Sequence, residues 1–223
     1  MGDYIPPQEV RNHYVQALGK KLGQSYYDLL IELILLHEKW KQYCELFGKD
    51  QQRIDLLNKV APLFFWYLQH TLFDDIQLHL ARLTDPPQTG SGKNRQENLT
   101  MRRLPQLIDD PKFKREVEKL LEEVEQKCEF ARKWRNKRLA HLDANTRANP
   151  QLLPPRTRKK VEDALEAMRH LMNSVAKHYG TAEIVYEVSD VGGAASLVYK
   201  LEKWLQQENQ ERLLLRQRLQ RSN

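Results

Sequence analysis

The chain has 223 residues, of which 40% are hydrophobic and 30% are charged, with nine glycines and ten prolines. This composition is typical of a folded helical protein and excludes a disordered or fibrous one. The net charge is +6 and the mean hydropathy is −0.72, a low value that suits long amphipathic helices with charged outer faces. We expect residues 1–223 to form a single all-α domain.

No segment resembles a membrane span or a signal peptide. The longest apolar run, residues 29–36, is interrupted by Glu32 and is far shorter than the ~20 residues that cross a bilayer. The N-terminus has neither a basic start nor an apolar h-region. Cys44 and Cys128 are far apart and lack neighbouring cysteines, which argues against a zinc site or a disulfide framework. We therefore expect a cytoplasmic protein with free thiols, no membrane contact and no metal or other cofactor.

The first half of the chain predicts two long helices. Apolar residues recur at steps of three and four over residues 25–47, and Gly48 follows as a helix cap. A second pattern covers residues 54–83, but Pro62 lies inside it. Proline has no backbone N–H and interrupts a helix, so we expect a break near Val60.

The second half predicts shorter helices joined by loops. Residues 84–98 contain prolines and glycines and predict a mobile loop, followed by a short helix over residues 99–108. Asp110 and Pro111 then supply the N-cap and first position of a long helix that continues to Trp134. Residues 145–155 are predicted to be a loop.

The last part of the chain predicts two more helices. Residues 156–179 are amphipathic and end at Gly180, and residues 181–190 show the alternation of a short extended segment. A final helix is expected from residue 194 to 221, within a C-terminal helix and tail that is polar and charged and covers residues 194–223.

The positive charge is concentrated in one segment. Residues 131–160 contain ten basic residues and one acid, so they carry a net charge of +9 and the rest of the chain sums to −3. The basic residues are Arg132, Lys133, Arg135, Lys137, Arg138, Arg147, Arg156, Arg158, Lys159 and Lys160. A local basic field favours a polyanionic partner. The alternative is a solvated helix end with a basic loop, since cations are favoured near helix C-termini.

The segment from Arg135 to Asp143 resembles a known motif. Arg135 is followed by the polar residue Asn136 and, after five intervening residues, by His141. Proteins of the HEPN superfamily carry such an arginine, polar residue and histidine near the end of one helix of an antiparallel bundle. Spacing of this kind also occurs by chance, so the rest of the chain has to support the resemblance.

Four further segments, in chain order, resemble the AbiU2 (abortive infection) branch of that superfamily. They are Ile54-Asp55-Leu56-Leu57-Asn58 with Ala61-Pro62, Arg82-Leu83-Thr84-Asp85-Pro86-Pro87, Asn98-Leu99-Thr100, and Ala140-His141-Leu142-Asp143 after Arg135-Asn136-Lys137. The resemblance covers about residues 26–201. It implies an antiparallel helical bundle of HEPN type with additional helices. The superfamily includes both ribonucleases and non-catalytic binding domains.

The motif residues suit cleavage of RNA without a metal ion. Attack of the 2′-hydroxyl on its phosphate needs proton transfer and stabilisation of the developing phosphorane charge. Histidine titrates near neutrality, so His141 is the candidate general acid or base. Arg135 is the candidate charge clamp, because guanidinium donates to phosphate oxygens, and Asn136 is the candidate positioning group. The candidate RNA contacts are Arg132, Lys133, Lys137, Arg138, Arg156, Arg158, Lys159 and Lys160. Arg138, three residues before His141, is the expected local phosphate contact.

The angle between Arg135 and His141 raises a geometric question. On a regular helix, six residues turn about 600°, which leaves the two side chains about 120° apart. The helix must therefore end or distort before His141, or two chains must share the site. The family resemblance implies the second, a homodimer whose motifs face one cleft. The alternative is that Arg135 pairs with an acid of a neighbouring helix while His141 caps the helix end.

Other polar clusters are better explained by structure than by chemistry. His70 and Asp74, like Asp75 and His79, are four residues apart and could ligate a metal in a bundle. No Glu-x-x-His occurs in the chain, so hydrogen-bonded pairs are the better interpretation. The candidate supporting residues are Arg82, Asp85 and Asp143. Asp85 is expected to brace the loop near the motif.

Two classes of function follow. The first is a metal-independent HEPN endoribonuclease of phage defence or toxin type. The second is a non-catalytic HEPN module that binds RNA, a nucleotide or a partner protein through the same basic face. The expected partners are RNA, a second copy of the chain, and an antitoxin or other defence protein.

Overall fold

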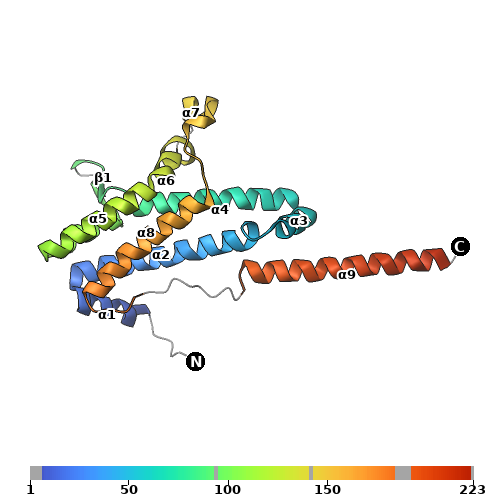
Figure 1. Ribbon diagram of the computed structural model, residues 1–223, viewed down its shortest axis with the longest axis horizontal. Helices are drawn as coiled ribbons and strands as arrows, with labels where there is room; N and C mark the ends of the chain where they lie inside the picture. Colours follow the sequence, from blue (N-terminus) through green and yellow to red (C-terminus); the bar gives the residue numbers. More distant parts are fainter. Residues whose placement is uncertain (1–6, 93–94, 141–142, 184–191, 222–223) are drawn as a thin grey trace. The chain divides into compact units, whose positions relative to one another are not determined.

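The computed structural model describes residues 7–92, 95–140, 143–183 and 192–221 (Figure 1). Nearly all regular structure within these ranges is helical, which confirms the all-α class. The α-helices are α1 (Pro7–Leu18), α2 (Lys20–Phe47), α3 (Gln51–Val60), α4 (Pro62–Leu83), α5 (Pro111–Lys127), α6 (Glu129–Trp134), α7 (Ala144–Ala148), α8 (Arg158–His178) and α9 (Ala194–Arg221). The 3₁₀ helices are η2 (Met101–Leu107) and η4 (Pro150–Leu152), and η3 (Arg135–Leu139) is a π-helix.

The chain divides into two compact units. The first contains the described residues of 7–37 and 74–183, and the second contains those of 38–73 and 192–221. Helices α2 and α4 each contribute to both units. The single-domain organisation expected from the sequence stays a prediction.

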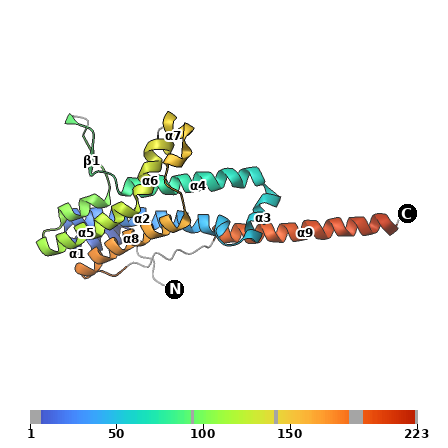
Figure 2. The same ribbon diagram turned by 45° about the horizontal axis from the view of Figure 1, so that its top comes forward.

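The core of the first unit lies between α2, α5 and α8. Helices α5 and α8 pack side by side in both ribbon views (Figures 1 and 2). Their buried stripes include Val117 and Val124 of α5 and Met168 and Leu171 of α8. The buried Tyr26 of α2 donates its hydroxyl to the carbonyl of Met172 at 3.2 Å. This bond satisfies the one polar atom of an otherwise apolar contact.

The core of the second unit joins α2, α3, α4 and α9. Its buried residues are Leu46, Leu57, Phe65, Ala194 and Val198. The first turns of α9 are therefore part of a core, although they are distant in sequence from the other three helices.

Several predicted boundaries are confirmed. The second long helix is interrupted at Ala61, whose N–H still donates to Leu57 at 3.0 Å, and α4 begins at Pro62, where no backbone N–H is needed. Asp110 caps α5 by accepting from the backbone of Lys112 and Phe113. These backbone bonds are the main reason why the pKa of Asp110 is lowered.

Other parts differ from the sequence prediction. Helix α1 was not predicted, and it is joined to α2 by Gly19, whose φ of +82° favours glycine. Four residues later, a Cβ at Gly23 would lie only 2.4 Å from the carbonyl oxygen of Tyr14. Glycine therefore permits the close approach of α1 and α2. The short helix predicted for residues 99–108 is a 3₁₀ helix.

Two predicted loops contain regular structure, and one predicted helix is interrupted. Residues 84–98 include strands β1 (Gln88–Thr89) and β2 (Gln96–Glu97), which pair antiparallel. Residues 145–155 are not simply a loop, because α7 and η4 fall within them. The predicted helix from Pro111 to Trp134 breaks at Cys128, where ψ is −3°. Residues 184–190 of the predicted extended segment lie outside the described residues.

Candidate functional site

Arg135 begins the π-helix η3, directly after α6. Its Nη1 donates to the carboxylate of Asp85, and its Nε donates to Oδ1 of Asn136 at 3.0 Å. The side chains of Arg135 and Asp85 are 22% and 20% exposed. The guanidinium is therefore oriented by two acceptors and still meets solvent. The acid comes from the loop after α4, so Arg135 does pair with an acid near a neighbouring helix, as the structural alternative proposed.

Asp85 is held by buried threonines on both sides of its loop. Thr84 donates its hydroxyl to the carbonyls of Leu80 and Ala81 at 3.2 and 3.1 Å. Thr100, which is also buried, donates to the carbonyls of Leu83 and Asp85 at 3.0 and 2.8 Å. The two bonds of Thr100 connect the motif Arg82-Leu83-Thr84-Asp85-Pro86-Pro87 to the motif Asn98-Leu99-Thr100.

Thr84 and Thr100 were not identified as site residues from the sequence. Asn98 reinforces the same loop by donating to the carbonyl of Pro86 at 2.8 Å. The sequence feature that could have identified Thr84 and Thr100 is that each follows a leucine in a largely polar segment. That signal does not reveal which carbonyls the hydroxyl groups meet.

The helix is distorted at the motif. The N–H of Ala140 donates to the carbonyl of Arg135, five residues earlier, at 2.8 Å. Such π turns are rare in helices, and those that do occur are often found at functional sites. The angle of about 120° assumed a regular helix. Since the helix is not regular here, the angular argument for a shared site no longer applies.

His141 and Leu142 lie outside the described residues. The backbone on both sides of them is described. Asp143 N–H donates to the carbonyl of Lys137 at 3.2 Å, and Lys137 Nζ lies 3.4 Å from the Asp143 carboxylate. The carboxylate also caps α7 by accepting from Thr146 N–H at 2.7 Å, and this bond is the main cause of the lowered pKa of Asp143. Asp143 thus joins the end of the motif to α7.

Arg156 is enclosed by other side chains. Its guanidinium carbon lies 4.1 Å from the centre of the Trp134 ring, and its Nη1 donates to the carboxylate of Asp74. Trp134 in turn donates its indole N–H to the carbonyl of Pro154 at 2.8 Å. These contacts join the two ends of the segment that contains the motif and α7. They suit a structural role for Arg156 better than an RNA contact.

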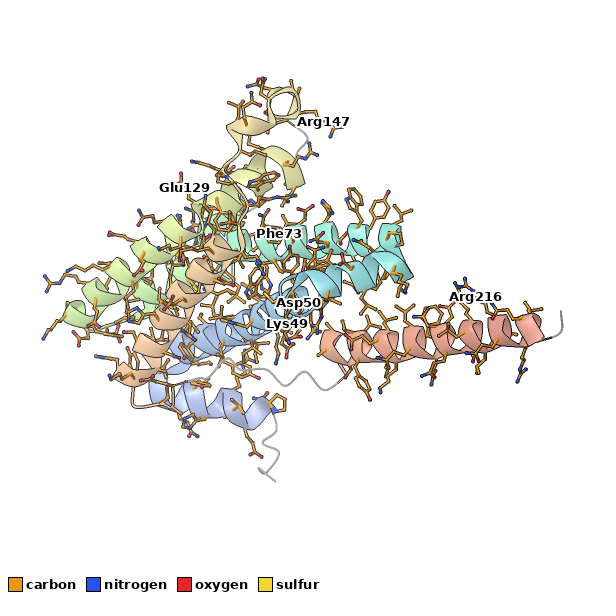
Figure 3. The ribbon with its side chains drawn as sticks, turned by 45° about the vertical axis from the view of Figure 1, so that its right-hand side comes forward. Lys49, Asp50, Phe73, Glu129, Arg147 and Arg216 are labelled. Atoms are coloured by element: carbon orange, nitrogen blue, oxygen red, sulfur yellow. The ribbon has the colours of Figure 1, made fainter. Side chains whose placement is uncertain are left out.

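Several of the other basic residues contact acceptors of the protein itself. Lys133 pairs with Glu129 at 2.8 Å, and Lys159 pairs with Asp163 at 3.0 Å, which raises the pKa of Lys159. Arg132 donates to the carbonyl of Glu125 at 2.8 Å. Figure 3 labels Glu129, the partner of Lys133, and Arg147, which lies in α7.

At least five of the ten cations of residues 131–160 are therefore paired with carboxylates. The side chains that point to solvent include those of Arg82, Arg138 and Arg158. Lys160 is half-buried, with its Nζ 5.8 Å from the centre of the Phe130 ring. The positive field of residues 131–160 is therefore weaker than their net charge of +9 suggests.

Three of the four side chains in the two histidine and aspartate pairs on α4 contact residues outside those pairs. His70 Nδ1 lies 2.7 Å from the carbonyl of Trp66, and Asp74 pairs with Arg156. His79 Nε2 lies 2.9 Å from the carboxylate of Glu32. Among the described residues, no three His, Cys, Asp or Glu side chains are grouped so that they could hold a metal ion.

A hollow in the described part of the first unit lies away from the motif. It has a volume of about 630 Å³, lies between α5 and α8, and is lined by charges of both signs, among them Glu123, Lys127, Glu166 and Arg169. None of the predicted site residues that the structure describes lines this hollow. A smaller hollow of about 230 Å³ includes Lys133 and Lys160 beside Phe130. No helix in the described part of the chain is long and apolar enough to span a membrane.

An all-α chain with Arg135 and Asn136 at the end of a helix has the features of the HEPN class. The family model HEPN_AbiU2, described as AbiU2, matches residues 19–193, so the chain belongs to the AbiU2 family of HEPN proteins. Searches of curated proteins and of solved structures found no match.

Proposed function

We propose that this protein is a metal-independent endoribonuclease of the HEPN type. The RNA 2′-hydroxyl loses its proton and attacks the adjacent phosphorus, and the bond from phosphorus to the 5′ oxygen breaks. The leaving oxygen takes up a proton, so the products are a 2′,3′-cyclic phosphate and a 5′-hydroxyl. His141 transfers protons, Arg135 stabilises the charge on the phosphorane, and Asn136 positions the reacting groups.

One observation carries this proposal. The side chains of Arg135 and Asn136 are hydrogen-bonded to each other on a π turn that ends two residues before His141. Asp85 orients the guanidinium from a loop that is held by hydrogen bonds of Thr84 and Thr100. An oriented cation loses little entropy when it binds a phosphate and needs no rearrangement as negative charge develops. The exposed Arg138 supports the proposal as a nearby phosphate contact.

The proposal extends to the assembly and the biological role. Membership of the AbiU2 family supports action in abortive infection, in which RNA cleavage halts an infected cell. The family pattern of facing motifs supports a two-fold homodimer, which would place two basic segments around one RNA. An antitoxin or other defence protein would then restrain the activity until it is needed.

The test is incubation of the pure protein with total RNA in excess EDTA. Cleavage is expected to persist, to leave 2′,3′-cyclic phosphate ends, and to disappear in Arg135→Ala and His141→Ala proteins that remain folded. Loss of cleavage on chelation, restored by Mg²⁺ or Mn²⁺, would overturn the metal-independent mechanism.

The second candidate is a non-catalytic HEPN module that binds RNA, a nucleotide or a partner protein. It is favoured by the Arg135 and Asp85 ion pair, because that pair also serves to fasten the loop to the helix. RNA binding without any cleavage, unaffected by His141→Ala, would select this function over the first.

A further inference from the structure

The first half of α4 is apolar on all its sides. From Val60 to Phe73 the chain contains no Lys, Arg, Asp or Glu. One side of this stretch belongs to the core of the second unit, where Phe65 is buried and Leu68 and Leu72 pack beside it. A helix that is apolar on all sides is normally covered on all sides. The other side of α4 therefore needs an explanation.

That other side is exposed and rich in aromatic rings. Exposed fractions are 67% for Leu63, 60% for Phe64, 52% for Trp66 and 59% for Tyr67. Their spacing of three and four residues places them on one side of the helix, which we call the aromatic face. The Trp66 ring lies 4.9 Å from that of Tyr67 and 4.3 Å from that of His70, between centres. Such a face is typical of a surface that binds another protein.

The last turns of α9 form another exposed apolar surface of the second unit. The first turns of α9 belong to the core, where Ala194 and Val198 are buried. Since a helix rises about 1.5 Å per residue, Leu213 lies roughly 20 Å along α9 from Val198. We call residues 212–221 the outer end of α9, and Figure 3 labels Arg216 within it. Its four leucines are 55–69% exposed: Leu213, Leu214, Leu215 and Leu219.

The outer end of α9 is complementary to the aromatic face. Residues 212–221 consist of four leucines, four arginines and two glutamines, so they carry a net charge of +4. The aromatic face has no Lys or Arg to repel these arginines, and a guanidinium packs well over an aromatic ring. Leucines of the outer end can then pack between the rings. Aromatic residues and arginine are enriched in protein interfaces.

A second α9 suits the outer end less well. Two outer ends side by side would bring eight arginines together, which costs Coulomb repulsion. The earlier turns of a second α9 are also poor partners, because Leu201 packs against the core of its own second unit and Leu205 is buried. Contact between two aromatic faces would leave the leucines of both outer ends uncovered.

The two surfaces do not cover each other within one chain, since both are exposed there. Within the second unit, α9 is one continuous helix that extends beyond α3 in both ribbon views (Figures 1 and 2). We propose that the outer end of α9 binds the aromatic face of α4 in a second copy of this chain. In a two-fold pair this contact occurs twice and covers both surfaces of both copies. The contact does not depend on the proposed ribonuclease activity.

The test is photochemical cross-linking of full-length chains. One chain carries Leu219→p-benzoylphenylalanine, and it is mixed with an unchanged chain that is labelled with heavy nitrogen. After irradiation and trypsin digestion, we expect position 219 to be cross-linked to residues 60–82 of the labelled chain. These residues form one tryptic peptide that contains the whole aromatic face. The heavy label shows that the contact is between chains.

Changes on each surface should reduce this cross-link. Trp66→Ser with Tyr67→Ser in the labelled chain should lower the yield at least about tenfold, as for the centre of an interface. Leu152→Ser, at an exposed leucine of the first unit, is the matched control and should keep the yield. Circular dichroism should show unchanged helix content in both variants.

Arg216→Gln in the cross-linking chain leaves α4 intact and should lower the yield severalfold, so this variant tests the contact without any change to the aromatic face. Several outcomes would overturn the proposal. They are the absence of a cross-link between chains, a cross-link to α9 in place of residues 60–82, and an equal yield with the Trp66 and Tyr67 variant.

Discussion

Arg135 donates to the carboxylate of Asp85, which lies 50 residues earlier in the chain. Both side chains are mostly buried, with 22% and 20% of their surfaces exposed. The pair therefore has two possible effects, which are to fasten the loop after α4 to the motif and to orient a cation toward substrate. These effects can be separated by measurement.

Asp85→Asn keeps an acceptor beside Arg135 but removes the charge. We expect the free energy of unfolding to fall by about 1 kcal/mol, as for a partly exposed ion pair. If the pair orients the guanidinium, RNA cleavage should fall by about tenfold or more. The matched control is Glu45→Gln, which weakens the pair between Glu45 and Arg53 in the second unit. That variant should lose similar stability and keep its cleavage rate, and equal rates in both variants would contradict the orienting role.

The π turn predicts the effect of removing one residue. Deleting Lys137 should allow residues 135–139 to close as a regular α-helix, which rotates the residues after the deletion relative to Arg135. Cleavage should fall by about a hundredfold, because reacting groups are sensitive to small displacements. Lys137→Ala is the control, since it removes the contact with Asp143 but keeps the chain length. A deletion variant that cleaves like the control would show that the π turn has no role in the activity.

The salt dependence of RNA binding should separate exposed from enclosed cations. Arg138 is exposed, so Arg138→Gln should remove one phosphate contact and reduce the slope of log affinity against log salt by about 0.7. Arg156→Gln should leave that slope unchanged, since its guanidinium lies between Trp134 and Asp74. It should instead lower the free energy of unfolding by about 1–2 kcal/mol. A reduced slope for Arg156→Gln would restore it as an RNA contact.

The helix boundaries that depend on local chemistry could be predicted from the sequence. Pro62 interrupts a helix because it has no backbone N–H, and Asp110 with Pro111 starts one because both suit its first turn. Helix α1 was missed because its apolar spacing is weak, with Tyr14 and Leu18 as its buried residues.

The candidate site was predicted only in part, because its geometry depends on distant residues. Counting charges along the chain gave +9 for residues 131–160, but Asp74 and Asp85 lie far upstream and neutralise two of those cations. The π turn was also beyond prediction, since helix periodicity assumes a regular helix. The role of Thr100 could not be predicted either, because its hydroxyl donates to the carbonyls of Leu83 and Asp85, which are 17 and 15 residues away in the chain.

His37 predicts a loss of stability in mild acid. Burial, together with a smaller effect of the positive charge of Arg169, lowers the pKa of His37 from 6.5 to about 4. Between these pH values the unfolded chain binds a proton that the folded chain does not, so stability is full above pH 6.5 and falls as the pH falls to about 4. Allowing for the part of the ring that meets solvent, the loss should be of order 1–2 kcal/mol.

Denaturant unfolding at several pH values would measure this effect. His37→Gln does not titrate in this range, so its stability should fall less steeply with pH than that of the unchanged protein. The exposed His13 provides the matched control, and His13→Gln should retain the original pH dependence. Identical pH profiles for His37→Gln and the unchanged protein would assign the acid sensitivity to other groups.

The proposed dimer predicts complementation between two inactive proteins. If one cleft takes its arginine from one chain and its histidine from the other, mixing Arg135→Ala with His141→Ala protein should restore cleavage. Random exchange makes about half of the dimers mixed, and each mixed dimer has one intact pairing out of two. About a quarter of the unchanged activity is therefore expected. The π turn also allows Arg135 to act with His141 of its own chain. In that case a complete site needs both residues in one chain, and neither chain of a mixed dimer has both. The mixture should then stay inactive, and that result would exclude a site shared between chains.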